Sequence, residues 1–141
     1  EHGDSSMIPW SHVTAAGKPV LELVRENPEV YQMDPPDVIL EKVHQGGYTE
    51  NADKGCTEFG VASAVCEIIC TILHDEHKIL PCSVKLDLHY GGPSCFASVP
   101  ARLGACGIED IPEISLTKSE SVSFQKSIQV ILKHFQWALS L

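Results

Sequence analysis

Apolar positions recur along the chain with two spacings, and the first is the period of two that is typical of strands. After residue 81, Val84, Leu86 and Leu88 alternate with charged or polar neighbours, which predicts a half-buried antiparallel strand. Residues 95–100 predict the paired return strand, and residues 108–116 predict a third extended segment. We therefore expect a three-stranded antiparallel meander.

The second spacing is the three-to-four-residue interval of an amphipathic helix. It runs through residues 57–77, where we expect the longest and most buried helix. An earlier helix is predicted to begin at residues 34–37, where aspartate and proline are typical of a first turn, and to stop at Gly46 and Gly47. Residues 10–26 predict one more short element.

A final helix is predicted near the C-terminus. Thr117 and Glu120 have the reciprocal spacing of a capping box. The apolar stripe that follows consists of Val122, Ile128, Ile131, Leu132, Phe135 and Leu139. Helices, strands and a helix in this order predict one α+β domain over residues 1–141, with the helices packed on an antiparallel sheet.

Length and charge narrow the class of protein. A chain of 141 residues fits one domain, and its formal net charge of −9 opposes binding to phosphate backbones and to anionic lipid. The apolar runs are about ten residues long, half of what a bilayer-spanning helix needs. We therefore expect neither a membrane partner nor a nucleic-acid partner.

The spacing of the cysteines indicates whether they form disulfides or bind a metal. Six cysteines lie among aliphatic residues, without the short, loop-rich spacing of a disulfide scaffold, so we expect reduced, mostly buried thiols and a cytoplasmic protein. Cys66, Cys70 and His74 share one helical face, with His77 close by in the sequence. Structural zinc sites usually draw their ligands from close pairs in loops, so we expect core packing on this face and no metal site.

Short motifs spread over the whole chain carry a resemblance to a known family. In chain order they are Glu1-His2-Gly3-Asp4-Ser5-Ser6, Pro9-Trp10-Ser11, Lys54-Gly55-Cys56-Thr57-Glu58-Phe59-Gly60-Val61-Ala62, Tyr90-Gly91, Ser98-Val99-Pro100 and Leu103-Gly104-x-x-Gly107-Ile108. Through them the chain resembles the C-terminal, substrate-binding domain of the lactate/malate dehydrogenase family, and it is most similar to members that act on L-lactate or L-2-hydroxyisocaproate. The resemblance implies an NAD-dependent dehydrogenase that interconverts a 2-hydroxy acid and a 2-oxo acid, with the malate branch as an alternative.

The resemblance also implies roles for three residues. His2 would donate and accept the proton of the reaction, Thr57 would border the substrate side chain, and Val61 would cover one face of the nicotinamide ring. From residue type alone, each has a simpler alternative. These are a solvated histidine for His2, a helix N-cap for Thr57 and a core position for Val61.

The resemblance implies that the main NAD site lies elsewhere. No Gly-x-Gly-x-x-Gly follows a predicted strand, and the chain starts at Glu1, directly before His2. We therefore expect a separate N-terminal half that holds NAD, orients the histidine with an aspartate and binds the substrate carboxylate with an arginine. The expected partners are that half, a small 2-hydroxy or 2-oxo acid, and further copies in a dimer or tetramer. The chain alone is expected to be inactive, and the alternative is a non-catalytic oligomerisation or interaction module.

Overall fold

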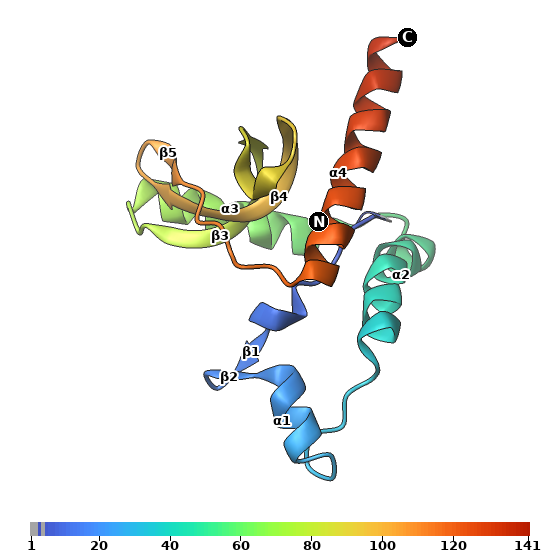
Figure 1. The fold of residues 1–141 in the computed structure, drawn as a ribbon. Coiled ribbons are helices and arrows are strands. Elements are labelled where there is room, and N and C mark those ends of the chain that lie inside the picture. The colour runs from blue at the N-terminus through green and yellow to red at the C-terminus, as the bar shows by residue number, and fades with distance from the viewer. Residues whose placement is uncertain (1–2, 4) are drawn as a thin grey trace.

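Figure 1 shows the fold of the chain in a computed structural model, which describes Gly3 and residues 5–141. The elements in chain order are η1 (Trp10–His12), β1 (Thr14–Ala15), β2 (Lys18–Pro19), α1 (Val20–Glu26), α2 (Pro36–Lys54), α3 (Phe59–Leu73), β3 (Lys78–Leu86), η2 (His89–Gly91), β4 (Cys95–Gly104), β5 (Gly107–Asp110) and α4 (Lys118–Leu139). Strands β3, β4 and β5 form one antiparallel sheet in that order, and β1 pairs with β2 in a separate hairpin. The expected α+β fold with a three-stranded meander is confirmed.

The alternation in β3 and β4 places their apolar side chains on one face of the sheet. Leu86 pairs with Cys95, and both side chains are buried. Val84 pairs with Ala97 in the same way. The alternation fails at Leu88, which is 81% exposed and has a φ of 67°, because the ladder ends at Leu86 and the chain turns into η2.

The third extended segment is only partly a strand. Pairing with β4 shifts register between Arg102 and Leu103, and β5 ends at Asp110. Residues 111–116 leave the sheet without regular structure and run toward α4, with Ile111 packed against the core. The extended pattern therefore continues beyond the ladder because its apolar side chains still pack.

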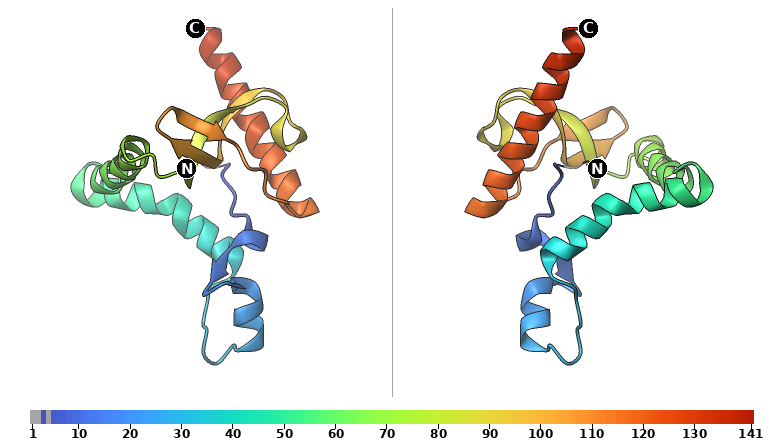
Figure 2. Two further views of the ribbon diagram at one scale, coloured as in Figure 1. Left: turned by 90° about the vertical axis from the view of Figure 1, so that its left-hand side faces the viewer. Right: turned by 90° about the vertical axis from the view of Figure 1, so that its right-hand side faces the viewer.

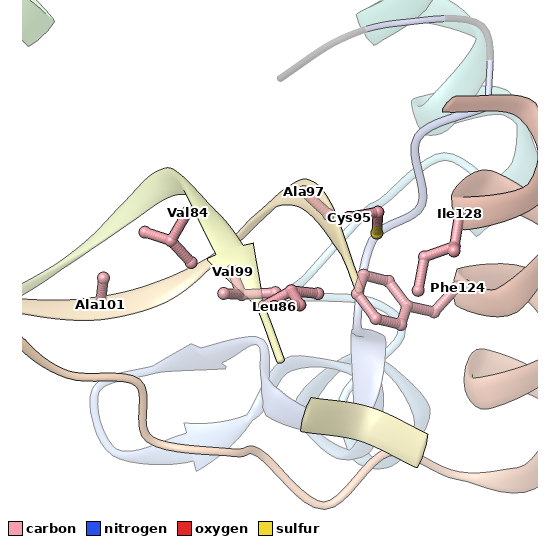
Figure 3. Close-up of a cluster of buried hydrophobic side chains, with 8 residues drawn as sticks. All are labelled: Val84, Leu86, Cys95, Ala97, Val99, Ala101, Phe124 and Ile128. Carbon is pink, nitrogen blue, oxygen red and sulfur yellow. The ribbon is translucent and has the colours of Figure 1, made fainter. Parts of the chain in front are cut away.

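Helix α4 closes the core against the sheet. Ile128 is 0% exposed, and Phe124 lies one turn before it; both side chains project from α4 toward Leu86 and Cys95 (Figure 3). Gly92 allows the chain after η2 to approach the helix, because a Cβ there would lie 3.2 Å from Ile128 Cδ1. The core therefore lies between α4 and one face of the β3–β4 pair.

The start of α4 follows the predicted capping box. Glu120 N–H donates to Thr117 Oγ1 at 3.3 Å, and Thr117 N–H donates to Glu120 Oε2 at 2.8 Å. The predicted apolar stripe is only half right. Ile128 is buried and Ile131 and Leu132 are partly buried, but the exposed members are Val122, Phe135 and Leu139.

Helix α2 is longer than its glycines predicted. It continues through Gly46 and Gly47 to Lys54, so the expected stop at the glycine pair is wrong. Each glycine costs a helix about 1 kcal/mol relative to alanine, which weakens the helix without removing a hydrogen bond. The actual end is Gly55, whose φ of 80° is the left-handed conformation of a helix C-terminus and whose N–H donates to the Asn51 carbonyl.

Helix α3 has the predicted type but not the predicted burial. It is shorter than α4, with 15 residues against 22, and Thr71 is its buried residue. Its apolar side chains face outward: Phe59, Val61, Val65, Ile69 and Leu73 are 48–75% exposed. The expectation of the longest and most buried helix is therefore wrong, because helical periodicity shows that a face is apolar without showing what covers it.

The cysteines are less buried than expected, because apolar neighbours in the sequence do not show what covers a side chain. Cys95 is buried and Cys82 half-buried, and the exposed cysteines are Cys56, Cys66, Cys70 and Cys106. All six are free thiols, as expected for reduced cysteines. Burial raises the pKa of Cys82 and Cys95, which keeps both thiols protonated and weakly nucleophilic at neutral pH.

The chain exposes more surface than a compact domain of its mass. Its accessible surface is 9839 Å², whereas a compact 15.4 kDa monomer exposes about 7,200 Å². Figures 1 and 2 show that the β1–β2 hairpin and α1 extend away from the sheet and α4 rather than cover them. The surplus exceeds the roughly 800 Å² that one partner contributes to a standard interface.

The described helices fall short, in length or in apolar character, of what a bilayer-spanning helix needs. None of them is by itself long and apolar enough to cross a membrane. Helices α2 and α3 reach that length and composition only as a pair, and the pair is bent by 118°.

Truncation of the core side chain of α4 tests this packing. Ile128→Ala is expected to lower the free energy of unfolding by about 2–5 kcal/mol, because it removes a fully buried side chain and leaves a cavity. Leu139→Ala, in the same helix but 72% exposed, is the matched control and is expected to change it by less than about 0.5 kcal/mol. Urea unfolding followed by circular dichroism measures both, and equal effects would contradict this core.

Candidate functional site

The candidate proton donor, His2, lies outside the residues that the structure describes, and so does Asp4. Immediately after them, Ser6 N–H donates to the carbonyl of Gly3 at 2.8 Å and closes a turn.

Two helices hold the turn that follows His2. Ser5 Oγ lies 3.2 Å from Ser127 Oγ on α4. Ser6 Oγ lies 3.0 Å from His44 Nε2 on α2. Both contacts are partly buried, so the chain directly after His2 is fixed relative to helices that come much later in the sequence.

A third contact anchors the N-terminal segment to the start of α4. Ser11 donates to Glu120 twice, from its N–H to Oε1 at 2.9 Å and from its hydroxyl to Oε2 at 2.7 Å. Burial opposes ionisation of Glu120, but these bonds and those from Thr117 outweigh it and lower the pKa of Glu120 from 4.5 to about 2. One carboxylate thus caps α4 and anchors η1.

A cavity of about 260 Å³ lies between the N-terminal segment, the sheet and α4. Its lining includes Ser6, Pro9, Tyr90, Ser98, Val99 and Ser127. Apolar carbon with a few hydroxyl groups is typical of small-molecule sites, although this volume is below the roughly 300–1,000 Å³ of most of them. Thr57 and Val61 do not line this cavity.

Tyr90 is the titratable side chain of the cavity lining, and it is tied into the fold. Its ring centroid lies 5.1 Å from that of Phe124, and its hydroxyl accepts the N–H of Ile114 at 3.3 Å. Its carbonyl accepts a bond from Gln125 Nε2 at 2.9 Å. Burial raises the pKa of Tyr90, so the hydroxyl stays neutral at physiological pH. The described lining can bind a ligand but offers no proton-transfer group near neutrality.

Thr57 lies in the short link between α2 and α3. Gly55 ends α2, and Lys54 Nζ lies 4.8 Å from the ring centroid of Phe59, so a cation–π contact bridges the two helix ends. Thr57 itself is exposed. The link is therefore held at both ends while its threonine is open to solvent.

The simpler alternatives for Thr57 and Val61 are wrong. The N-cap of α3 is Glu58, and no side chain makes the capping bond. Val61 is 58% exposed and is therefore not a core valine. Both side chains are accessible at the start of α3, and the pocket and nicotinamide roles that the resemblance assigns to them stay predictions.

Sequence reasoning missed the residues that fix the N-terminal segment. His44 and Ser127 contact Ser6 and Ser5 across 38 and 122 positions, and no local pattern marks such pairs. The hydroxyl of Ser5 thus contacts a side chain of α4 and not the neighbouring backbone of its own turn. The spacing of Thr117 and Glu120 in the sequence predicted the helix cap but not the two hydrogen bonds that Ser11 donates to Glu120.

The chain matches one family over nearly its whole length. Residues 1–140 match the family described as lactate/malate dehydrogenase, alpha/beta C-terminal domain. The chain is 37% identical over 131 residues to L-lactate dehydrogenase 3 of Bacillus anthracis, with 93% of this chain and 42% of that protein covered. It is 37% identical over 139 residues to L-lactate dehydrogenase 1 of Bifidobacterium longum subsp. longum, with 99% and 44% covered. It thus spans less than half the length of the curated relatives it matches.

Solved structures show the same relation. The minor L-lactate dehydrogenase from Enterococcus mundtii, in its ligands-bound form, matches with a TM-score of 0.86 and 32% identity, covering 94% of this chain and 42% of that chain. A lactate dehydrogenase from a Medee basin deep-sea metagenome library matches with a TM-score of 0.88 and 27% identity, covering 96% and 43%. Both similarities therefore extend over nearly all of this chain.

The anchor at Glu120 predicts a defined acid sensitivity. Because its pKa falls from 4.5 to about 2 on folding, its stabilisation is present above pH 4.5 and is lost as the pH falls toward 2. Over this pH range the free energy of unfolding of the wild type is expected to fall by about 1 kcal/mol more than that of Glu120→Gln, after allowance for solvent screening. Glu41→Gln, an exposed carboxylate on α2, is the control. Free energies of unfolding measured by urea across this pH range test it, and parallel curves for wild type and Glu120→Gln would contradict it.

Proposed function

Because this chain belongs to the lactate/malate dehydrogenase family, we propose that it is the C-terminal, substrate-binding part of an NAD-dependent L-2-hydroxyacid dehydrogenase. The observation that carries the proposal is 37% identity to L-lactate dehydrogenases over nearly the whole chain. The proposed substrates are small 2-hydroxy and 2-oxo acids whose side chain is small or branched and apolar. The names of the relatives and of the matching structures favour the lactate branch over the malate branch.

In this proposal His2 is the general acid and base. Its neutral imidazole takes the hydroxyl proton when the 2-hydroxy acid is oxidised, and its imidazolium returns the proton when the 2-oxo acid is reduced. NAD, when bound, exchanges a hydride with the substrate carbon. The contacts of Ser5 with Ser127 and of Ser6 with His44 support this role, because they restrict the chain directly after the histidine.

Thr57 and Val61 complete the proposed substrate side of the site. The short side chain of Thr57 limits the room for the substrate side chain. Val61 presents an apolar surface to the nicotinamide ring and excludes water from the reacting carbon. The exposure of both residues supports these roles, because a pocket formed with a second chain segment needs side chains that this chain leaves uncovered.

The residues of this chain fit only part of what the reaction needs. Its two arginines, Arg25 and Arg102, lie on α1 and β4, and neither lines the cavity. No glycine-rich phosphate loop follows a strand. We infer that an N-terminal half supplies the carboxylate-binding arginine and most of the NAD site, and that the assembled protein is a homo-oligomer. A cytoplasmic location stays a prediction from the sequence.

An activity assay separates this proposal from a non-catalytic interaction module. The protein with its N-terminal half present is expected to oxidise NADH when pyruvate or another small 2-oxo acid is added. His2→Ala is expected to lower kcat about 10²–10⁴-fold, the usual contribution of a general acid. His134→Ala, an exposed histidine on α4, is the matched control and is expected to keep the wild-type rate.

The chain of 15.4 kDa alone, verified by intact mass under denaturing conditions, is expected to show no turnover. Turnover by that verified sample would contradict the need for an N-terminal half. An unchanged kcat in His2→Ala would contradict the role of the histidine. Absence of turnover in the complete protein would favour the interaction module.

Self-association of the isolated chain is a second expected outcome. The surplus apolar surface, and the exposed face of α3 above all, is expected to make sedimentation depend on concentration. Ile69→Lys, in the middle of that face, is expected to shift the equilibrium toward monomer, whereas Gln129→Lys on an exposed polar position of α4 leaves it unchanged. A well-folded monomer at high concentration would contradict this expectation.

A further inference from the structure

Three side chains with metal-binding atoms converge at a place that the proposed reaction does not use. Asp75 and His77 occupy the turn between α3 and β3, and Glu109 lies on β5. One ligand atom from each lies within 4.8 Å of the others. His77 Nδ1 lies 2.7 Å from Glu109 Oε2, and its Nε2 lies 3.5 Å from Asp75 Oδ2. An imidazole thus lies between two carboxylates that come from different elements.

Gly104, at the end of β4, makes room for this convergence. A Cβ at this position would lie 2.1 Å from Glu109 Oε1 and 2.9 Å from Asp75 Oδ1, closer than side chains tolerate. Both carboxylates therefore lie against the glycine backbone. Asp75 Oδ1 also accepts the N–H of Ala105 at 2.7 Å, which fixes the orientation of that carboxylate.

The chemistry of this cluster favours a divalent cation. Two carboxylates over one glycine repel each other, in a chain that already carries a net charge of −9. One imidazole nitrogen and carboxylate oxygens are ligands that zinc accepts, with water at an open position. Arg102 on the neighbouring strand is the positive charge that acts against the ion.

We propose that Asp75, His77 and Glu109 bind one Zn²⁺ ion, which links the turn after α3 to strand β5. The site differs from the cysteine and histidine face considered in the sequence, because within the described part of the chain the ligand atoms that converge are those of Asp75, His77 and Glu109. Sequence spacing did not reveal it because Glu109 follows His77 by 32 positions. The bound ion would add a second link between the turn after α3 and β5, which the contact of His77 Nδ1 with Glu109 Oε2 already connects.

The test is a titration of the purified protein with Zn²⁺ by calorimetry and with Co²⁺ by absorption spectroscopy. The proposal predicts one ion per chain, with affinity lowered at least tenfold in His77→Gln and in Glu109→Gln. His74→Gln, an exposed histidine three positions earlier, is the matched control and is expected to bind as the wild type does. All substituted side chains are exposed, and circular dichroism checks that each variant keeps its fold.

A second variant tests the geometry without removing a ligand. Gly104→Ala is expected to weaken binding as well, because the new methyl group must displace the Glu109 carboxylate. Binding that persists in His77→Gln and Glu109→Gln, or no binding by the wild type, would overturn the proposal. So would a sulfur-to-cobalt charge-transfer band that disappears in Cys66→Ser with Cys70→Ser, since the thiols would then be the ligands.

Discussion

The packing of α4 on the β3–β4 pair is the interaction on which the rest of the structure depends. Ile128 and Phe124 cover the face that carries Leu86 and Val84, and burial of such side chains contributes roughly 1.5–3 kcal/mol each. The same helix supplies Glu120 to η1 and Ser127 to the turn after His2. The packing of α4 therefore forms the core and, together with α2, places the N-terminal segment that the proposed reaction requires.

Away from that contact, the chain is poorly covered. Helix α3 presents apolar side chains to solvent. The accessible surface of the chain exceeds that of a compact monomer of this mass by far more than the roughly 800 Å² that one partner contributes to a standard interface. The chain spans less than half the length of the L-lactate dehydrogenases it matches. In the proposed protein a second segment would cover the exposed α3 face together with Thr57 and Val61, so one arrangement would account for both.

Local physics made much of the fold predictable, and its failures have specific causes. The alternation around Val84 and the capping box at Thr117 reflect interactions between near neighbours, and both predictions are confirmed. Gly46 and Gly47 misled the prediction of α2, because glycine weakens a helix without breaking its hydrogen bonds. The predicted burial of α3 is wrong because helical periodicity does not show which residues, if any, cover the apolar face. The motif residues led to the family, but contacts such as Ser5 with Ser127 join positions too distant for any pattern to reveal.

The arrangement also explains why the proposed chemistry is divided between two parts of a protein. The described cavity lining contains hydroxyl groups, apolar carbon and one neutral tyrosine, so it cannot transfer protons or bind an anion strongly near neutral pH. A net charge of −9 further opposes an anionic substrate. This chain contributes the placement of its N-terminal segment, because α2 and α4 both contact the residues after His2. In the proposed reaction a second, positively charged segment would bind the acid, and this domain would contribute the anchored segment that follows His2.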